Sequence, residues 1–161
     1  MQLGVLRPFL YCDLAQWSGL PQLTLDDMVR TLGTPQAQTV EHLGYYPCER
    51  YCFPLATPTG GLIAYTRQGN VVLVETVALP APAIPAGLPE PCGQLPHELL
   101  IEGAYAHEYV YCEKGLVLTI ARSLKNVEPD RLVRYRGVRR LANVSEFGPE
   151  YYKAFEDREL F

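Results

Sequence analysis

The chain has 161 residues, of which 48% are hydrophobic and 20% charged, and its formal net charge is −4. This length suits one domain or two small halves that share a core, and the composition is that of a globular protein, which excludes disordered and fibrous classes. The longest apolar runs, 71–74 and 116–121, fall far short of the roughly 20 residues that cross a membrane, so no membrane-spanning segment is expected.

The N-terminal residues 1–17 are apolar but lack the layout of a signal peptide. Arg7 follows the first apolar residues, Pro8 interrupts them, and no pair of small residues marks a cleavage site. We therefore expect an extended segment that ends in a turn at 18–21, in a cytoplasmic protein. Cysteines stay reduced there and an odd number cannot all pair, so a structural disulfide is not expected. The five cysteines are Cys12, Cys48, Cys52, Cys92 and Cys112.

The segment 23–35 carries agreeing start, period and stop signals for a helix. Thr24 is a good N-cap residue, and Asp27 three positions later completes a capping box. Gly33 then supplies the left-handed residue after the helix, and Pro35 prevents its continuation. The predicted apolar stripe consists of Leu25, Met28, Val29 and Leu32.

Extended structure is predicted after this helix. Residues 36–43 have a weak helical period and are expected to form one or two turns, and 49–53 read as a short strand. Two segments rich in β-branched residues, 62–66 and 71–77, are separated by a four-residue link with Gly69 and Asn70. That pattern predicts a β-hairpin.

The second part of the chain repeats this order after a proline-rich connector. Six prolines between residues 79 and 96 exclude a helix or a central strand there. Residues 108–112 and 116–121 predict a second hairpin across a turn that closes on Gly115. A further strand is expected over 127–136. A C-terminal helix is predicted to begin with Gly148 as N-cap and Pro149 as its first residue.

The predicted fold class is α+β: mainly an antiparallel sheet of hairpins with a few short helices, in two similar halves if the repeat is a true duplication. We expect residues 1–161 to form a single compact unit, with sub-halves 20–79 and 92–161 joined by the connector 80–91. Whether the halves fold independently stays open.

The predicted helix closes with Leu32, Gly33 and Pro35, and a predicted strand opens at Gly61. This order resembles the tandem modules of the β-lactamase inhibitor protein and of related small outer-membrane-assembly lipoproteins. The resemblance covers residues 23–77 and, more weakly, 90–135. It implies a non-catalytic sheet whose face binds another protein. The long loop 45–61, the proline connector and the lack of a lipoprotein signal depart from the family pattern, and no functional residue transfers by position.

Motifs for metal binding and catalysis are weak. The best zinc candidate combines Cys48 and Cys52 with His42, Cys92 and Cys112. Against it, Cys92 and Cys112 lie twenty residues apart, so a second cysteine pair at zinc-ligand spacing is missing. We assign no metal ligand and no cofactor, and leave open whether Cys48 and Cys52 bind a metal or form a disulfide. The nearest nucleophile–base pair, Cys112 and His107, would point to opposite faces of a strand, because five positions separate them. No catalytic residue is therefore assigned.

Residues 131–140 carry five of the fourteen basic residues and no acidic one, in an otherwise acidic chain. Guanidinium groups bind carboxylates and phosphates well, so this arginine stripe predicts a partner with an acidic patch. The alternative is internal pairing with Glu146, Glu150 and Asp157. A pI near 5.4 argues against nucleic acid.

Eleven tyrosines against five phenylalanines and one tryptophan add to this picture, since tyrosine anchors interfaces and also lines core edges. We therefore expect a non-catalytic protein-binding module of inhibitor, immunity or adaptor type, with homo-oligomers left open. The alternative is a small cysteine-dependent enzyme or ligand-binding domain that uses Cys112 and His107 in a cleft between the halves. The predicted partner-binding residues are Tyr109, Tyr111, Arg131, Arg134, Tyr135, Arg136, Arg139 and Arg140.

Overall fold

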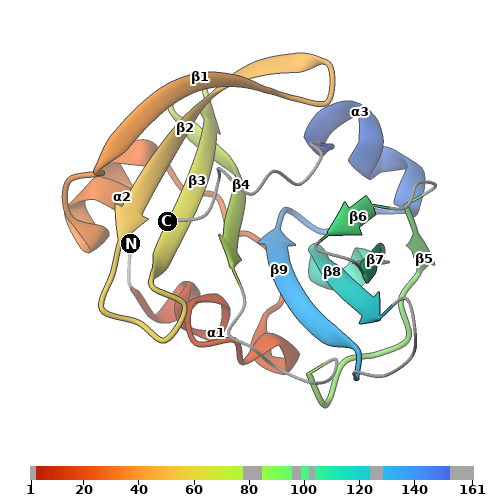
Figure 1. The fold of residues 1–161 in the computed structure, drawn as a ribbon. Coiled ribbons are helices and arrows are strands. Elements are labelled where there is room, and N and C mark those ends of the chain that lie inside the picture. The colour runs from red at the N-terminus through yellow and green to blue at the C-terminus, as the bar shows by residue number, and fades with distance from the viewer. Residues whose placement is uncertain (1–2, 78–84, 96–98, 102–103, 124–128, 153–161) are drawn as a thin grey trace.

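The computed structural model describes residues 3–77, 85–95, 99–101, 104–123 and 129–152, and confirms the α+β class with a mainly antiparallel sheet and short helices. The strands of this part of the chain form one sheet, shown in Figure 1. They are β1 (Ala37–Leu43), β2 (Tyr46–Pro54), β3 (Gly61–Arg67), β4 (Asn70–Val77), β5 (Gly93–Gln94), β6 (Leu99–Ile101), β7 (Ala104–Tyr111), β8 (Leu116–Ser123) and β9 (Arg131–Gly137).

The sheet consists of two meanders joined at their last strands. The order is β1-β2-β3-β4-β9-β8-β7-β5, and β6 also pairs with β7. Strand β4 lies antiparallel to β9, with Val74 opposite Gly137 and Val77 opposite Arg134. Both predicted hairpins are present: β3 and β4 turn at Gln68 and Gly69, whose φ angles are positive, and β7 and β8 turn through η3 (Cys112–Lys114) and Gly115.

The helix predicted over 23–35 is confirmed as α2 (Leu25–Leu32). The Thr24 hydroxyl accepts a hydrogen bond from the Asp27 amide at 3.1 Å, and the Asp27 carboxylate accepts one from the Thr24 amide at 3.0 Å. Gly33 follows with a φ of 93°. Met28 is fully buried, while the rest of the apolar stripe packs against the core and stays partly exposed.

Three local predictions are wrong. Residues 37–43 form a strand instead of helical turns, because a tight turn at Gly44 and Tyr45 pairs them with β2. The N-terminal segment is helical instead of extended, with η1 (Leu3–Val5), α1 (Arg7–Leu10) and η2 (Leu14–Gln16); Pro8 lies at the start of α1, where a missing amide hydrogen costs little. The last helix, α3 (Phe147–Tyr151), begins after η4 (Val144–Glu146), so Glu146 takes the N-cap position predicted for Gly148.

Both faces of the sheet carry a hydrophobic core. On one face, Trp17, Phe9 and Met28 from the N-terminal helices pack on strand residues such as Leu118 and Tyr135. The Tyr135 hydroxyl donates a hydrogen bond to the Phe9 carbonyl at 2.6 Å. The second cluster joins Phe147 and Tyr151 of α3 and Leu95 to the opposite faces of the strands, among them Ile63, Leu73, Val110 and Val117. Helices and connections therefore cover most of the sheet.

A disulfide joins Cys92 to Cys112, so the prediction that the cysteines stay reduced is wrong for this pair. It ties the end of the proline-rich connector to the β7–β8 turn, and β5 continues this contact by pairing with β7. The spacing of 20 residues gave no sign of the pairing, because only the fold brings the two positions together. Cys12, Cys48 and Cys52 are thiols. In the described part of the chain, no helix is long and apolar enough to span a membrane.

Residues 80–84 of the predicted connector and residues 127–128 of the predicted last strand lie outside the described residues. Within the described part, β9 confirms the strand from Arg131 onward.

Candidate interaction surface

The structure splits the predicted arginine stripe into three environments. Arg131 is exposed at the start of β9, and Arg139 and Arg140 are exposed beyond its end. Between them, Arg134 and Arg136 each have 2% of their surface exposed. Tyr135 and Tyr111 are buried as well, at 0% and 3%. The prediction that these four residues lie on an exposed binding surface is therefore wrong, since a partner cannot reach them in this structure.

The two buried arginines belong to an ion network beneath the surface. Arg134 donates to Glu75 from Nη1 at 3.1 Å, to Glu108 from Nη2 at 2.9 Å and to the Thr119 hydroxyl from Nε at 3.1 Å. Thr119 donates in turn to Glu108 at 3.1 Å, and Arg136 also donates to Glu108. These five residues come from β4, β7, β8 and β9. We call them the buried ion network.

The network is neutral overall, with two carboxylates and two guanidinium groups, which is the condition under which buried charges are tolerated. Burial alone would raise the pKa of Glu108. Attraction to Arg136 and Arg134, together with hydrogen bonds from Arg134 and Thr119, outweighs burial and lowers that pKa. Burial and the neighbouring Arg134 charge lower the pKa of Arg136. Each group depends on the others, so the network is structural and joins the two meanders.

The exposed arginines after β9 pair within the chain. Arg139 lies 3.4 Å from Glu146 and 3.2 Å from Glu150, and Arg140 donates from Nε to the Ser18 carbonyl at 3.0 Å. The internal alternative considered for the stripe is therefore confirmed for Glu146 and Glu150. Asp157, the third predicted partner, lies outside the described residues.

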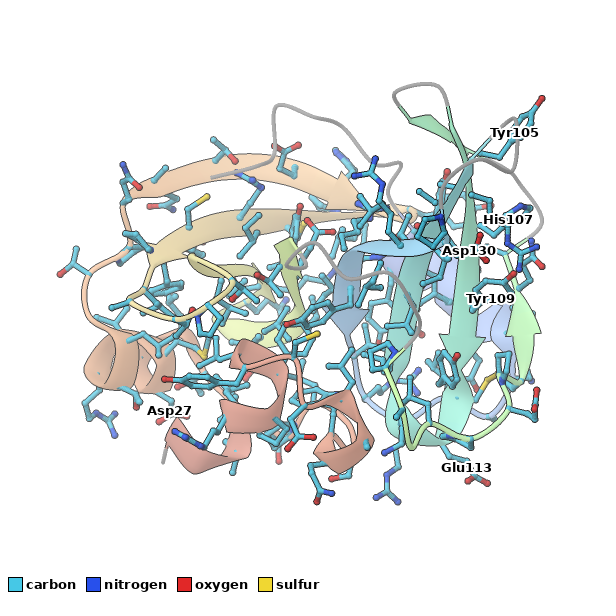
Figure 2. The ribbon with its side chains drawn as sticks, turned by 60° about the horizontal axis from the view of Figure 1, so that its bottom comes forward. Asp27, Tyr105, His107, Tyr109, Glu113 and Asp130 are labelled. Atoms are coloured by element: carbon cyan, nitrogen blue, oxygen red, sulfur yellow. A yellow bond between two sulfur atoms is a disulfide. The ribbon has the colours of Figure 1, made fainter. Side chains whose placement is uncertain are left out.

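A group of polar and aromatic side chains lies on one face of β7 and β8. Tyr105 is 48% exposed, and His107 and Tyr109 follow at every second position of the strand, partly exposed. Arg122 donates from Nη2 to the Tyr109 hydroxyl at 2.8 Å, and its Nε lies 3.3 Å from the Asp130 carboxylate. Figure 2 shows the labelled Tyr105, His107, Tyr109 and Asp130 gathered at one side of the molecule. These five residues form what we call the β7–β8 patch.

Hydrogen bonds and ring contacts hold the patch in place. The ring centroids of His107 and Tyr109 are 6.4 Å apart. The side-chain amide nitrogen of Gln94, in β5, is hydrogen-bonded to His107 Nδ1 at 2.9 Å. Tyr109 is one of the predicted partner-binding residues, whereas the other four residues of the patch are not among them. The alternation of β7, in which Ala106, Glu108 and Val110 are buried, was the signal that could have found Tyr105.

The residues proposed for zinc binding and catalysis are not brought together. Cys112 is 5% exposed and its sulfur is bonded to Cys92, so it offers no thiolate to His107. Among the residues that the structure describes, no group of three or more histidine, cysteine or acidic side chains is placed to hold a metal ion.

An open groove of about 530 Å³ lies in the first meander, between β1, β2 and the β3–β4 turn. Its lining includes Val40, Tyr46, Glu49 and Arg67. The Arg67 guanidinium stacks over the Tyr46 ring with its carbon 5.1 Å from the centroid, and it also donates to backbone carbonyls of Leu43 and Glu150. Arg67 thereby fixes the β1–β2 hairpin to α3.

Comparisons with known proteins leave the family open. No family model and no curated protein sequence matches this chain. Among solved structures, a cysteine-rich secretory protein from Staphylococcus aureus is similar at 11% sequence identity and a TM-score of 0.38. The match covers 88% of this chain and 52% of that one.

Proposed function

We propose that this protein is a non-catalytic protein-binding module whose recognition surface is the β7–β8 patch. The observation that carries this proposal is the placement of Tyr105, Tyr109 and Arg122 on one accessible face, with Tyr109 and Arg122 already joined by a hydrogen bond. Tyrosine and arginine are the residue types enriched among interface hot spots. Side chains held in place before binding lose less conformational entropy when a partner docks.

The charge of the surrounding surface favours a partner with acidic groups. Arg122 is about half exposed, and Arg131 lies next to Asp130 at the same end of the sheet. Asp130 offsets part of this charge, so we expect a polar interface with one or two ion pairs rather than a strongly basic one. The resemblance to tandem inhibitor modules, which also bind proteins through a sheet, agrees with this proposal and remains a prediction.

The disulfide changes the compartment that we propose. Disulfides persist in oxidising environments and are rare in a reducing cytoplasm. The Cys92–Cys112 bond therefore favours an oxidising compartment over the cytoplasm expected from the sequence. Mass spectrometry of alkylated protein from the native host, with and without reductant, distinguishes the two compartments.

A capture experiment with matched variants tests the binding proposal. Full-length protein, Tyr105→Ala and Arg122→Glu are immobilised in parallel and exposed to extract of the native host, and each captured protein is then purified and its Kd measured. Tyr11→Ala is the control, because Tyr11 is a 40% exposed tyrosine outside the patch. A hot-spot loss of about 2 kcal/mol weakens binding about 30-fold. If Tyr105→Ala and Arg122→Glu bind every captured partner as tightly as Tyr11→Ala does, the patch is not the recognition surface.

A further inference from the structure

The two edges of the described sheet differ in how they are protected. At one edge lie β5 and β6, strands of two and three residues. At the other lies β1, with seven residues that pair with β2 without a register shift and are exposed from Ala37 to Val40. Figure 1 shows β1 along the outer margin of the molecule. Natural sheets usually protect such an edge with charged side chains, especially lysine, or with proline, a bulge or a short strand. Of these devices β1 has a single charged residue, Glu41.

The turn after β1 determines which backbone groups face outward. Leu43 and Tyr46 are partners across a two-residue turn, and such a turn closes on a pair that exchanges both hydrogen bonds. Because the pattern alternates, residues 37, 39, 41 and 43 direct their backbone groups toward β2. Gln38, Val40 and His42 therefore direct their amide hydrogens and carbonyls away from the sheet.

The sequence of β1 is complementary to itself in the antiparallel direction. When a second β1 is placed with Val40 opposite Val40, all seven residues overlap, and every outward-facing residue meets another outward-facing one. Roughly six hydrogen bonds then form between the strands. The opposed pairs are Ala37 with Leu43, Gln38 with His42, Thr39 with Glu41, and Val40 with itself.

The side chains agree with this register. Gln38 opposite His42 and Thr39 opposite Glu41 are hydrogen-bonding pairs, and no like charges stand directly opposite each other. Val40 is 76% exposed, which is high for an apolar residue in the middle of a strand, and in this register it packs against its own copy. A shift by one residue would set outward-facing groups against inward-facing ones.

We propose that two copies of this chain associate through β1, with the two-fold axis at Val40, to form one sheet that continues across both subunits. The interface is separate from the β7–β8 patch, which lies in the other meander. Both copies of the patch therefore stay accessible in the dimer.

Cysteine crosslinking tests the register. Residues opposite each other in a hydrogen-bonded pair have Cα atoms about 5.5 Å apart, a distance that a disulfide can span. Val40→Cys should therefore give an oxidised covalent dimer. Gln38→Cys is the matched control, because the two copies of residue 38 lie four positions apart, at least about 13 Å. The wild type measures the background from Cys12 and Cys52.

Sedimentation velocity across a concentration series tests the association itself. We expect a dimer of the full chain whose association is weakened at least about tenfold by Val40→Lys, since two lysines would then stand opposite each other. Val5→Lys, a substitution at a 45% exposed residue outside β1, should have no effect. A monomer up to about 100 μM, a dimer unaffected by Val40→Lys, or equal crosslinking at positions 38 and 40 would each overturn the proposal.

Discussion

Replacing Glu108 with glutamine tests whether the buried ion network holds the two meanders together. One oxygen of Glu108 accepts hydrogen bonds from Thr119, Arg134 and Arg136, and the side chain is fully buried. The substitution keeps the shape of the side chain but removes its charge. Two guanidinium groups then remain with one carboxylate, that of Glu75.

The expected loss of stability is large for a single substitution. Leaving a buried charge without compensation costs about 3–5 kcal/mol. A domain of this kind has a total free energy of unfolding of about 5–15 kcal/mol. We therefore expect Glu108→Gln to lower the free energy of unfolding by about 3 kcal/mol, because the amide oxygen still accepts some hydrogen bonds.

Urea unfolding followed by circular dichroism and by Trp17 fluorescence measures this loss. Glu146→Gln is the control, because it breaks the ion pair with Arg139 at the surface. The Arg139 side chain is 49% exposed and that of Glu146 is 32% exposed, so the loss of free energy of unfolding should be less than about 1 kcal/mol. The double variant Glu108→Gln with Arg136→Met should be less destabilised than the sum of its single variants. A loss below about 1 kcal/mol in Glu108→Gln would refute the reasoning.

Three further predictions concern the Glu108 carboxyl, the disulfide and the cap of α2. Folding lowers the pKa of Glu108 from its ordinary 4.5, so the ionised carboxylate stabilises the folded protein fully at pH values above 4.5. This stabilisation is lost as the pH falls through the folded pKa. In an acid titration, the free energy of unfolding of Glu108→Gln should therefore fall less steeply than that of the wild type. Cys92→Ser with Cys112→Ser should reduce the free energy of unfolding by about 3 kcal/mol under oxidising conditions, and should make it insensitive to reductant. Thr24→Ala should cost about 1 kcal/mol in the same urea assay by removing the N-cap, whereas Thr24→Ser should be nearly neutral.

Local signals in the sequence predicted much of the fold. The α2 helix has its cap, apolar stripe and stop within thirteen residues, so no distant contact is needed to define it. The hairpins at Gly69 and Gly115 are similarly local, because both turns contain residues with positive φ. Strand β1 was mistaken for helical turns because its edge position leaves most of its side chains exposed and hides the alternation of a half-buried strand.

The candidate site was harder to predict because burial depends on partners far along the chain. Arg134 and Arg136 look like surface cations in the sequence, and their carboxylate partners lie 59 and 28 residues away respectively. The disulfide likewise depends on which segments become neighbours in the fold. Tyr109 was found because tyrosines are frequent in interfaces, whereas Arg122 lies in a segment with no unusual composition.

The seam between β4 and β9 has a consequence for how the chain could be divided. The first meander contributes the Glu75 carboxylate to the buried ion network, and the second contributes Glu108 and both guanidinium groups, so the second meander's share of the network has one positive charge in excess. Two fragments produced separately would thus present complementary strand edges and opposite net charges at the seam. We therefore expect two fragments cut within the connector to attract each other at this seam.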